Sequence, residues 1–191
     1  MTHARTVLWR GLYLPGAEYC GLSRSGEGVL LEGTALLAVD NRPYAVTYRI
    51  GCDPGWNTRC VDVRARSGAE NEQILTLAVD GQHRWWRGRD ELIELAGCAD
   101  VDLGFTPSTN TLPIRRLNLP IGSQREVTAA WVRVPELTVQ PLRQRYTRLS
   151  GTLYRYESLK SGFRAEIEVD EEGLVVVYSG GWERIAASGG K

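Results

Sequence analysis

The chain has 191 residues, of which 42% are hydrophobic and 24% are charged, proportions that suit one large domain with a substantial core. Lys and Arg together number 23, as do Asp and Glu, so the net charge is zero. That balance excludes the global basic field with which proteins attract nucleic acid or an anionic membrane surface, and we expect neither partner.

The N-terminal segment, residues 1–14, contains cations but neither a long apolar run nor a small-residue cleavage site, so it does not fit a secretory signal. No stretch approaches the roughly 20 consecutive apolar residues that a membrane-spanning helix needs. We therefore expect a cytoplasmic protein that is not embedded in a membrane.

Four cysteines are scattered over residues 20–98, and no C-x-x-C pair occurs. With only two histidines in the chain, this pattern does not fit structural zinc, and we expect no metal and no cofactor. We expect reduced thiols packed in strands at all four positions, Cys20, Cys52, Cys60 and Cys98.

Most of the chain alternates apolar and polar residues in short runs that end at turn residues, a pattern typical of β-strands. In the first half, the expected strands span residues 7–14, 18–23, 28–40, 44–50, 60–66, 73–80 and 83–87. Residues 88–97 fit either a helical turn or a short strand, and the pattern leaves both open.

The same pattern continues in the second half of the chain. The expected strands there span residues 99–103, 125–134, 137–149, 153–157, 163–169 and 174–178. About a dozen strands at this spacing predict an all-β sandwich, barrel or roll, in a single domain over residues 1–191. Residues 186–191 are small and polar, and we expect a disordered tail.

The segment FTPSTNTLPIRRLNL breaks this alternation and contains the one expected helix, about residues 106–118. Thr106 and Pro107 would begin the helix with a hydroxyl cap and a proline in the first turn, and Pro113 would then kink it. In the alternative, the lead-in is irregular, Thr111 is the cap and Pro113 lies in the first turn. Apolar residues on more than one side of the segment suit a helix that is surrounded by sheet.

Two adjacent cations, Arg115 and Arg116, lie in this segment. Because an unpaired cation is costly to bury, we expect them to pair with the nearest upstream carboxylates, those of Asp100 and Asp102. The next candidate partners are Glu18 and Glu157. The pairs would then be structural. In the functional alternative, the guanidinium groups reach a cavity mouth and hold an anionic or polyhydroxyl head group.

Several aromatic residues lie on expected strands. Trp85 and Trp86 are adjacent and face opposite sides, so we expect one in the core and one partly exposed. Trp131 lies inside an apolar run and is expected in the core. Tyr146, Tyr154 and Tyr156, on neighbouring late strands, are expected to line one interior.

Motifs of covalent and phosphate chemistry are missing, since the sequence has no G-x-S-x-G nucleophile elbow and no P-loop. Asp100 and Asp102 could serve as a glycosidase carboxylate pair, but neighbours on one face of one strand are better placed for salt bridges. We assign no catalytic residue.

Two adjoining segments, residues 100–103 (DVDL) and 106–117 (TPSTNTLPIRRL), resemble the signature of a bacterial family, the putative glycolipid-binding proteins. Shorter similarities follow at residues 18–20, 44–48, 56–59, 81–85, 129–132, 144–147, 154–156 and 169–178. Ser108 departs from the family pattern, which has an aromatic residue there, and would open space beside the helix.

The resemblance implies a mainly β fold, a spiral β-roll in which a highly curved, many-stranded antiparallel sheet wraps around one central helix. It also implies a homodimer, and a lipid or glycolipid ligand by likeness to curved-sheet lipid carriers.

We therefore expect a non-catalytic protein that binds a lipid or glycolipid inside the roll, beside the central helix. The alternative is an enzyme that acts on a lipid-like or sugar-bearing small molecule through an Asp/Asn/Arg cluster. In a third interpretation, the helix fills the roll and leaves no cavity. The candidate ligand-binding residues are Arg115, Arg116, Asn110, Asp100, Asp102, Tyr146, Tyr156 and Trp85.

Overall fold

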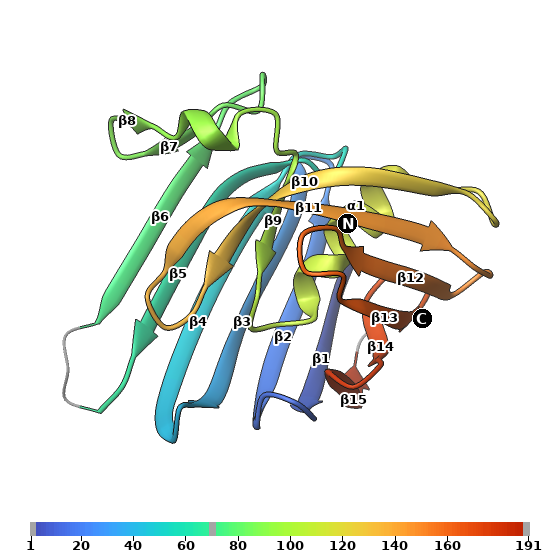
Figure 1. The fold of residues 1–191 in the computed structure, drawn as a ribbon, viewed down its shortest axis with the longest axis horizontal. Coiled ribbons are helices and arrows are strands. Elements are labelled where there is room, and N and C mark those ends of the chain that lie inside the picture. Colours follow the sequence, from blue (N-terminus) through green and yellow to red (C-terminus); the bar gives the residue numbers. More distant parts are fainter. Residues whose placement is uncertain (1–2, 69–71, 189–191) are drawn as a thin grey trace.

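The computed structural model describes residues 3–68 and 72–188, and in this part of the chain 15 strands form one highly curved sheet (Figure 1). The order in the sheet is β8-β7-β6-β5-β4-β3-β2-β1-β15-β14-β13-β12-β11-β10-β9. Consecutive strands lie side by side, except that β8 and β9 form the two edges, and β1 pairs instead with β15. The mainly β, strongly curved fold class predicted from the sequence is confirmed.

The strands of the first half are β1 (His3–Gly11), β2 (Gly16–Ser25), β3 (Gly28–Val39), β4 (Arg42–Cys52), β5 (Thr58–Arg66), β6 (Gln73–Val79), β7 (Trp85–Arg87) and β8 (Asp90–Glu91). Those of the second half are β9 (Asp100–Leu103), β10 (Gln124–Arg133), β11 (Thr138–Arg148), β12 (Leu153–Ser158), β13 (Arg164–Val169), β14 (Val175–Tyr178) and β15 (Trp182–Ser188). The pairing of β9 with β10 is parallel, and every other pairing between these strands is antiparallel.

Alternating burial explains why these segments are strands. In β6, Leu75, Leu77 and Val79 are buried, whereas the residues between them are exposed. Alternation of this kind places one face of the sheet in the core and the other in solvent. The buried faces of both halves contribute to one hydrophobic cluster.

Curvature brings the edge strand β9 back to the first half of the sheet. In Figure 1, β10 and β11 (yellow to orange) cross over the blue to green strands, and β9 lies beneath them. The backbone N–H of Thr58, at the start of β5, donates to the carbonyl of Ala99 at 3.0 Å. The backbone N–H of Val101 donates to the Thr58 hydroxyl at 3.1 Å. The sheet does not close into a barrel, and Thr58 links its edge strand to β5.

The helix between β9 and β10 is shorter than expected. A 3₁₀ turn, η2 (Ser108–Asn110), leads into α1 (Thr111–Leu117), so the α-helix starts five residues later than the first alternative places it. Asn110, not Thr106 or Thr111, precedes the first helical residue, and Pro113 lies in the first turn, where its missing N–H costs nothing. The helix ends at Asn118, which adopts the left-handed conformation (φ 40°) common after helices.

The expected disordered tail is corrected in part. Residues 186–188 belong to β15 and pair with β1, for example Ser188 with Thr6. The side chains of residues 186–188 are small and show no alternation, so the sequence does not predict a strand there. Backbone pairing with the free edge of β1 orders the segment. Residues 189–191 lie outside the described residues.

Two further expectations meet mixed outcomes. Residues 88–97 contain both alternatives, since β8 is followed by a 3₁₀ turn, η1 (Ile93–Leu95). All four cysteines are free thiols, and three of them are buried, but Cys60 is exposed because its position on β5 faces outward. In the described ranges, no helix has the length and apolar character needed to span a membrane.

Candidate functional site

A cavity of about 540 Å³ lies beside the helical lead-in, between β9 to β12 and the last two strands. We call it the aromatic cavity. It is lined by Asp102, Leu103, Gly104, Thr106, Pro107, Asn110, Trp131, Gln140, Pro141, Leu142, Tyr156, Ser158, Lys160, Ser161, Phe163, Tyr178 and Trp182. Segments from positions 102 to 182 of the chain therefore meet here only because the sheet curls.

Tyr156 organises the aromatic rings of this cavity. Its ring centroid lies 6.3 Å from that of Phe163 and 6.3 Å from that of Tyr178, in tilted arrangements. Tyr146, its cross-strand partner on β11, packs edge-on at 5.4 Å. These ring contacts give the cavity a continuous aromatic wall around Tyr156.

Trp131 forms another part of the wall, where the sequence predicts a core residue. It is only half-buried. Its indole lies against Gly104, and a Cβ at that position would overlap Nε1 of Trp131. Glycine at position 104 therefore makes room for an indole at the cavity surface, and the prediction of a core tryptophan is wrong.

Asp102 supplies the carboxylate of the cavity. The amide Nε2 of Gln144, on β11, donates to Oδ2 of Asp102. No described residue forms an ion pair with Asp102 or donates a hydrogen bond to Oδ1. Burial raises the pKa of Asp102 to about 6, against the opposing hydrogen bond from Gln144, and the nearby charge of Asp100 adds to the rise.

Asp100 forms the predicted ion pair, but with Arg116 alone. Nε of Arg116 donates to Oδ1 of Asp100 at 2.9 Å, and Nη2 donates to Oδ2 at 2.5 Å. Asp100 is 1% exposed. Burial raises the pKa of Asp100, and the hydrogen bonds and charge of Arg116 oppose that rise. Neither residue lines the aromatic cavity, so this pair braces β9 against the helix.

Arg115 points to a different place from Arg116. It lines a second, more polar cavity of about 400 Å³, which also contains Arg148, Tyr154 and Glu171. Its Nη1 donates to the backbone carbonyl of Glu171 at 3.0 Å. Its guanidinium lies 5.4 Å from the ring centroid of Trp56. Adjacent arginines on a short helix thus serve separate contacts.

Some of the other candidate ligand-binding residues line the aromatic cavity, and others lie behind it or in the core. Asn110 lines the aromatic cavity, and its Oδ1 accepts a hydrogen bond from the buried Tyr146 hydroxyl at 2.9 Å. Trp85 is fully buried, and its Nε1 donates to the carbonyl of Cys98 at 2.9 Å. The structure therefore brings together Asn110, Asp102 and Tyr156 in the wall, with Tyr146 behind them, and leaves Trp85 in the core.

Behind the cavity wall lies a buried carboxyl group that sequence reasoning does not place there. Oε1 of Glu18 accepts hydrogen bonds from the Tyr48 hydroxyl at 2.5 Å and from the hydroxyl of Thr106, a lining residue, at 2.7 Å. Burial raises the pKa of Glu18 to about 8, while both hydrogen bonds oppose the rise. Oε2 has no partner among the described residues. The one sequence feature that could have indicated this packing is Gly33, because a side chain at that position would overlap the Tyr48 ring.

Ser108 does not open space beside the helix, contrary to expectation. It is fully buried, and its hydroxyl is hydrogen-bonded to the hydroxyl of Tyr48 at 2.9 Å. Tyr48, from β4, therefore packs directly against this serine.

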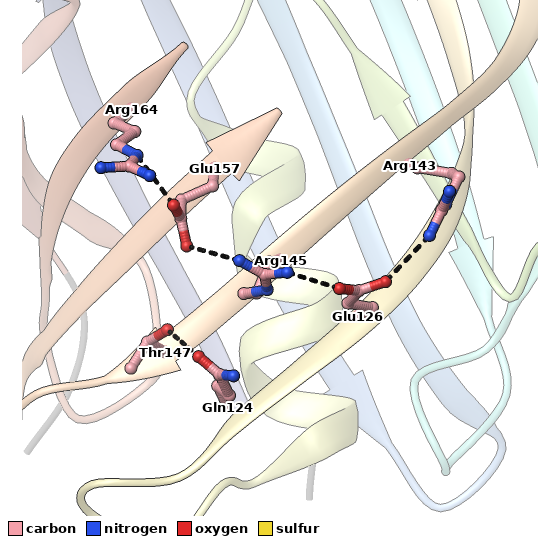
Figure 2. A network of polar contacts seen from close by, with 7 residues as sticks. All are labelled: Gln124, Glu126, Arg143, Arg145, Thr147, Glu157 and Arg164. Carbon is pink, nitrogen blue, oxygen red and sulfur yellow. Dashed lines mark hydrogen bonds and ion pairs between the residues drawn. The ribbon is translucent and has the colours of Figure 1, made fainter. Parts of the chain in front are cut away.

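The outer face of the same wall carries a ladder of alternating charges, shown in Figure 2. The ladder runs Arg143–Glu126 (3.0 Å), Glu126–Arg145 (2.6 Å), Arg145–Glu157 (3.5 Å) and Glu157–Arg164 (2.8 Å). Because neighbours along a strand face opposite sides, Arg143 and Arg145 face solvent while Gln144 points to the cavity. Surface pairs of this kind contribute little individually, but the ladder crosses four strands of the wall.

The described residues include no group of three or more His, Cys, Asp or Glu side chains that could hold a metal ion. The polar groups of the aromatic cavity are the Asp102 carboxylate, the Lys160 ammonium, amides and hydroxyls. Together with the aromatic faces, they suit hydrogen bonding and apolar contact.

Comparisons with known proteins identify relatives. Residues 6–184 match the model of a family described as "Putative glycolipid-binding". The crystal structure of a DUF1089 family protein from Pseudomonas aeruginosa is similar, with 34% sequence identity and a TM-score of 0.80 over 88% of this chain and 92% of that chain. A comparison with curated proteins finds no match. The family model covers nearly the whole chain, so the resemblance carried by residues 100–117 is confirmed, and the chain belongs to this family of glycolipid-binding description.

Proposed function

We propose that this protein binds a small amphipathic molecule, a lipid or glycolipid, in the aromatic cavity and does not transform it. The observation that carries the proposal is the lining, which combines five aromatic side chains with one carboxylate in a space of about 540 Å³. Small-molecule sites typically measure roughly 300–1,000 Å³ and place a few polar groups in an apolar wall.

The aromatic faces give the cavity its apolar capacity. Trp131, Tyr156 and Trp182 offer large, flat surfaces to an acyl chain or to the C–H face of a sugar ring, and each keeps a polar handle. Asp102 and Asn110 supply acceptors for hydroxyl groups. The family description supports the same class of ligand.

Of the residues singled out from the sequence, we assign Asn110, Asp102 and Tyr156 to direct ligand contact, with Tyr146 as their support. Arg115, Arg116, Asp100 and Trp85 are assigned to structural contacts. This division follows from which side chains line the cavity.

Native mass spectrometry of freshly purified protein, followed by organic extraction of the bound material, tests the proposal. We expect a co-purifying amphiphile in the wild type. Lys160→Trp, at the exposed mouth, should fill the entrance and remove the adduct, whereas Lys160→Ala loses the same amine without adding bulk and should keep it. No adduct, together with no uptake of added lipid or alkyl glycoside, would contradict the proposal.

An enzyme is the second candidate, and one observation favours it. Asp102 is a cavity carboxyl group whose pKa of about 6 lies near the value that suits a general base. Incubation of the purified protein with the ligand recovered above, followed by product analysis, separates the two functions. Turnover that Asp102→Asn abolishes would establish the enzyme and reject the non-catalytic binder.

We also propose a cytoplasmic location and a homodimer. Four free thiols support a reducing compartment, and the family resemblance supports the dimer. Cell fractionation and light scattering of the purified protein test these two statements.

A further inference from the structure

The charges that line the aromatic cavity are distributed unevenly. Asp102 and Lys160 are its two lining residues with charged side chains, and Lys160 is exposed at the mouth. Arg115 and Arg116 lie elsewhere, one at the second cavity and one in its pair with Asp100. Asp102 therefore has no ion-pair partner among the described residues, although Lys160 also lines the cavity.

The neighbours of Asp102 leave part of this carboxylate available. Gln144, which is 1% exposed, holds Oδ2 from β11. Oδ1 receives no hydrogen bond from the described residues, and Asp102 is itself a lining residue of the cavity. An unfilled acceptor in an apolar wall favours a ligand group that can donate a hydrogen bond.

The titratable groups near Asp102 come from its own strand and from three others. One is Tyr146 on β11, whose pKa is raised by burial and then by the charges of Tyr156 and Asp102. Asp100, two residues earlier on β9, is compensated by Arg116. Tyr156 on β12 and Tyr178 on β14 are near enough that burial and, after it, the Asp102 charge raise the pKa of both hydroxyls. These phenols stay protonated, so they can donate to or accept from a ligand hydroxyl beside Asp102.

We propose that Asp102 selects the head group that the aromatic cavity accepts: an uncharged, hydroxyl-bearing group such as a sugar, and not an anionic group such as a carboxylate, sulfonate or phosphate. A sugar hydroxyl donates to Oδ1, and its ring lies against the aromatic faces. An anionic head group would place a second negative charge beside the first in a poorly solvated wall. This inference rests on the proposed binding function and specifies its ligand class.

Calorimetric titration with two probes of equal chain length, decyl maltoside and decanesulfonate, both below their micelle concentrations, tests the selection. At pH 8 we expect the wild type to bind the maltoside at least about tenfold more tightly than the sulfonate, the scale of one like-charge contact. Asp102→Asn keeps the shape and removes the charge, and it keeps the acceptor at Oδ1 when the Gln144 amide turns to accept from the new Nδ2. It should leave maltoside affinity within about threefold and tighten sulfonate binding by about tenfold.

Two controls accompany the titration. Asp90→Asn removes one carboxylate on the exposed edge strand β8 and should leave the ratio of the two affinities unchanged. Lowering the pH of the wild type from 7 to 5, a range in which Glu18 stays protonated, protonates Asp102. This change should tighten sulfonate binding while maltoside binding stays level, because a sulfonate remains anionic throughout. This arm replaces the variant if Asp102→Asn does not fold.

The outcomes distinguish failure of the head-group selection by Asp102 from failure of the proposed binding function. If both probes bind the wild type equally, or Asp102→Asn and low pH leave the ratio unchanged, the selection by Asp102 is overturned and binding stands. If neither probe nor any extracted lipid binds, the binding function fails, and the selection fails with it.

Discussion

Arg116 holds Asp100 through two parallel hydrogen bonds, of 2.9 and 2.5 Å, at the junction of the helix and the edge strand β9. The sequence left two roles open for Arg116, because its guanidinium could either pair with a carboxylate or hold a ligand. In the structure, the guanidinium of Arg116 binds the buried carboxylate of Asp100 instead.

Arg116→Ala leaves Asp100 charged, buried and unpaired, so we expect it to lower the free energy of unfolding by about 3–5 kcal/mol in urea denaturation. Arg115→Ala is the matched control, because it removes an adjacent cation that contacts a carbonyl and a ring. We expect it to cost only about 0.5–1 kcal/mol. Equal stability of wild type and Arg116→Ala, with ligand binding lost, would mark Arg116 as a site residue.

Glu18 should make stability depend on pH. Burial raises its folded pKa from 4.5 to about 8, so the unfolded chain releases this proton at lower pH than the folded chain does. The free energy of unfolding should therefore fall as pH rises from about 4.5 to 8, and then level off.

Glu18→Gln should remove that part of the fall, on the order of a few kcal/mol between pH 5 and pH 9, as followed by thermal or urea unfolding at each pH. Glu32→Gln, at an exposed position on β3, should keep the wild-type profile. A Glu18→Gln profile that parallels the wild type would show that Glu18 ionises normally.

Gly104→Ala should impair binding with little loss of stability. The new methyl group overlaps Nε1 of Trp131, so the indole must leave its place in the cavity wall. We expect ligand affinity to fall by about tenfold, as loss of one well-packed aromatic contact would cause. Gly81→Ala, where a Cβ meets no atom within 4 Å, serves as the control. Unchanged affinity in Gly104→Ala would remove Trp131 from the site.

Thr58→Val should loosen the edge strand. The valine keeps the shape of Thr58 but leaves the buried N–H of Val101 without its acceptor, at a cost of about 1–3 kcal/mol. Hydrogen exchange of the Val101 amide should accelerate relative to that of a residue within β4. Thr58→Ser keeps the hydroxyl and should preserve the slow exchange; equal exchange in both variants would count against this link.

Local patterns predicted the parts of this fold that depend on local physics. Alternation located most strands, and their hairpin pairings follow from short turns. The break in alternation located the helix. The cost of burying an unpaired cation predicted the pairing of Arg116 with Asp100, 16 residues earlier. Strand β15 was missed, since Ala186, Ala187 and Ser188 have no alternation and gain order only from pairing with β1.

The cavity could not be predicted in the same way, because it depends on curvature. Trp131, Tyr178 and Trp182 lie on three strands whose side chains meet only after the sheet has curled. The pKa of Glu18 likewise depends on how deeply Tyr48 and Thr106 cover it. Sequence reasoning selected Asn110, Asp102 and Tyr156 as candidates from the segment and strands that contain them. It did not predict that they line one cavity.

The pairing of β1 with β15 has a consequence for synthesis of the chain. Strands β1 to β8 can pair in sequence as they leave the ribosome, since each follows its neighbour, whereas the other edge of β1 waits for residues 182–188. Trp182, the first residue of that last strand, also completes the aromatic cavity. A nascent chain therefore gains a continuous sheet and a complete aromatic cavity in the same final step, and a truncated product would carry neither.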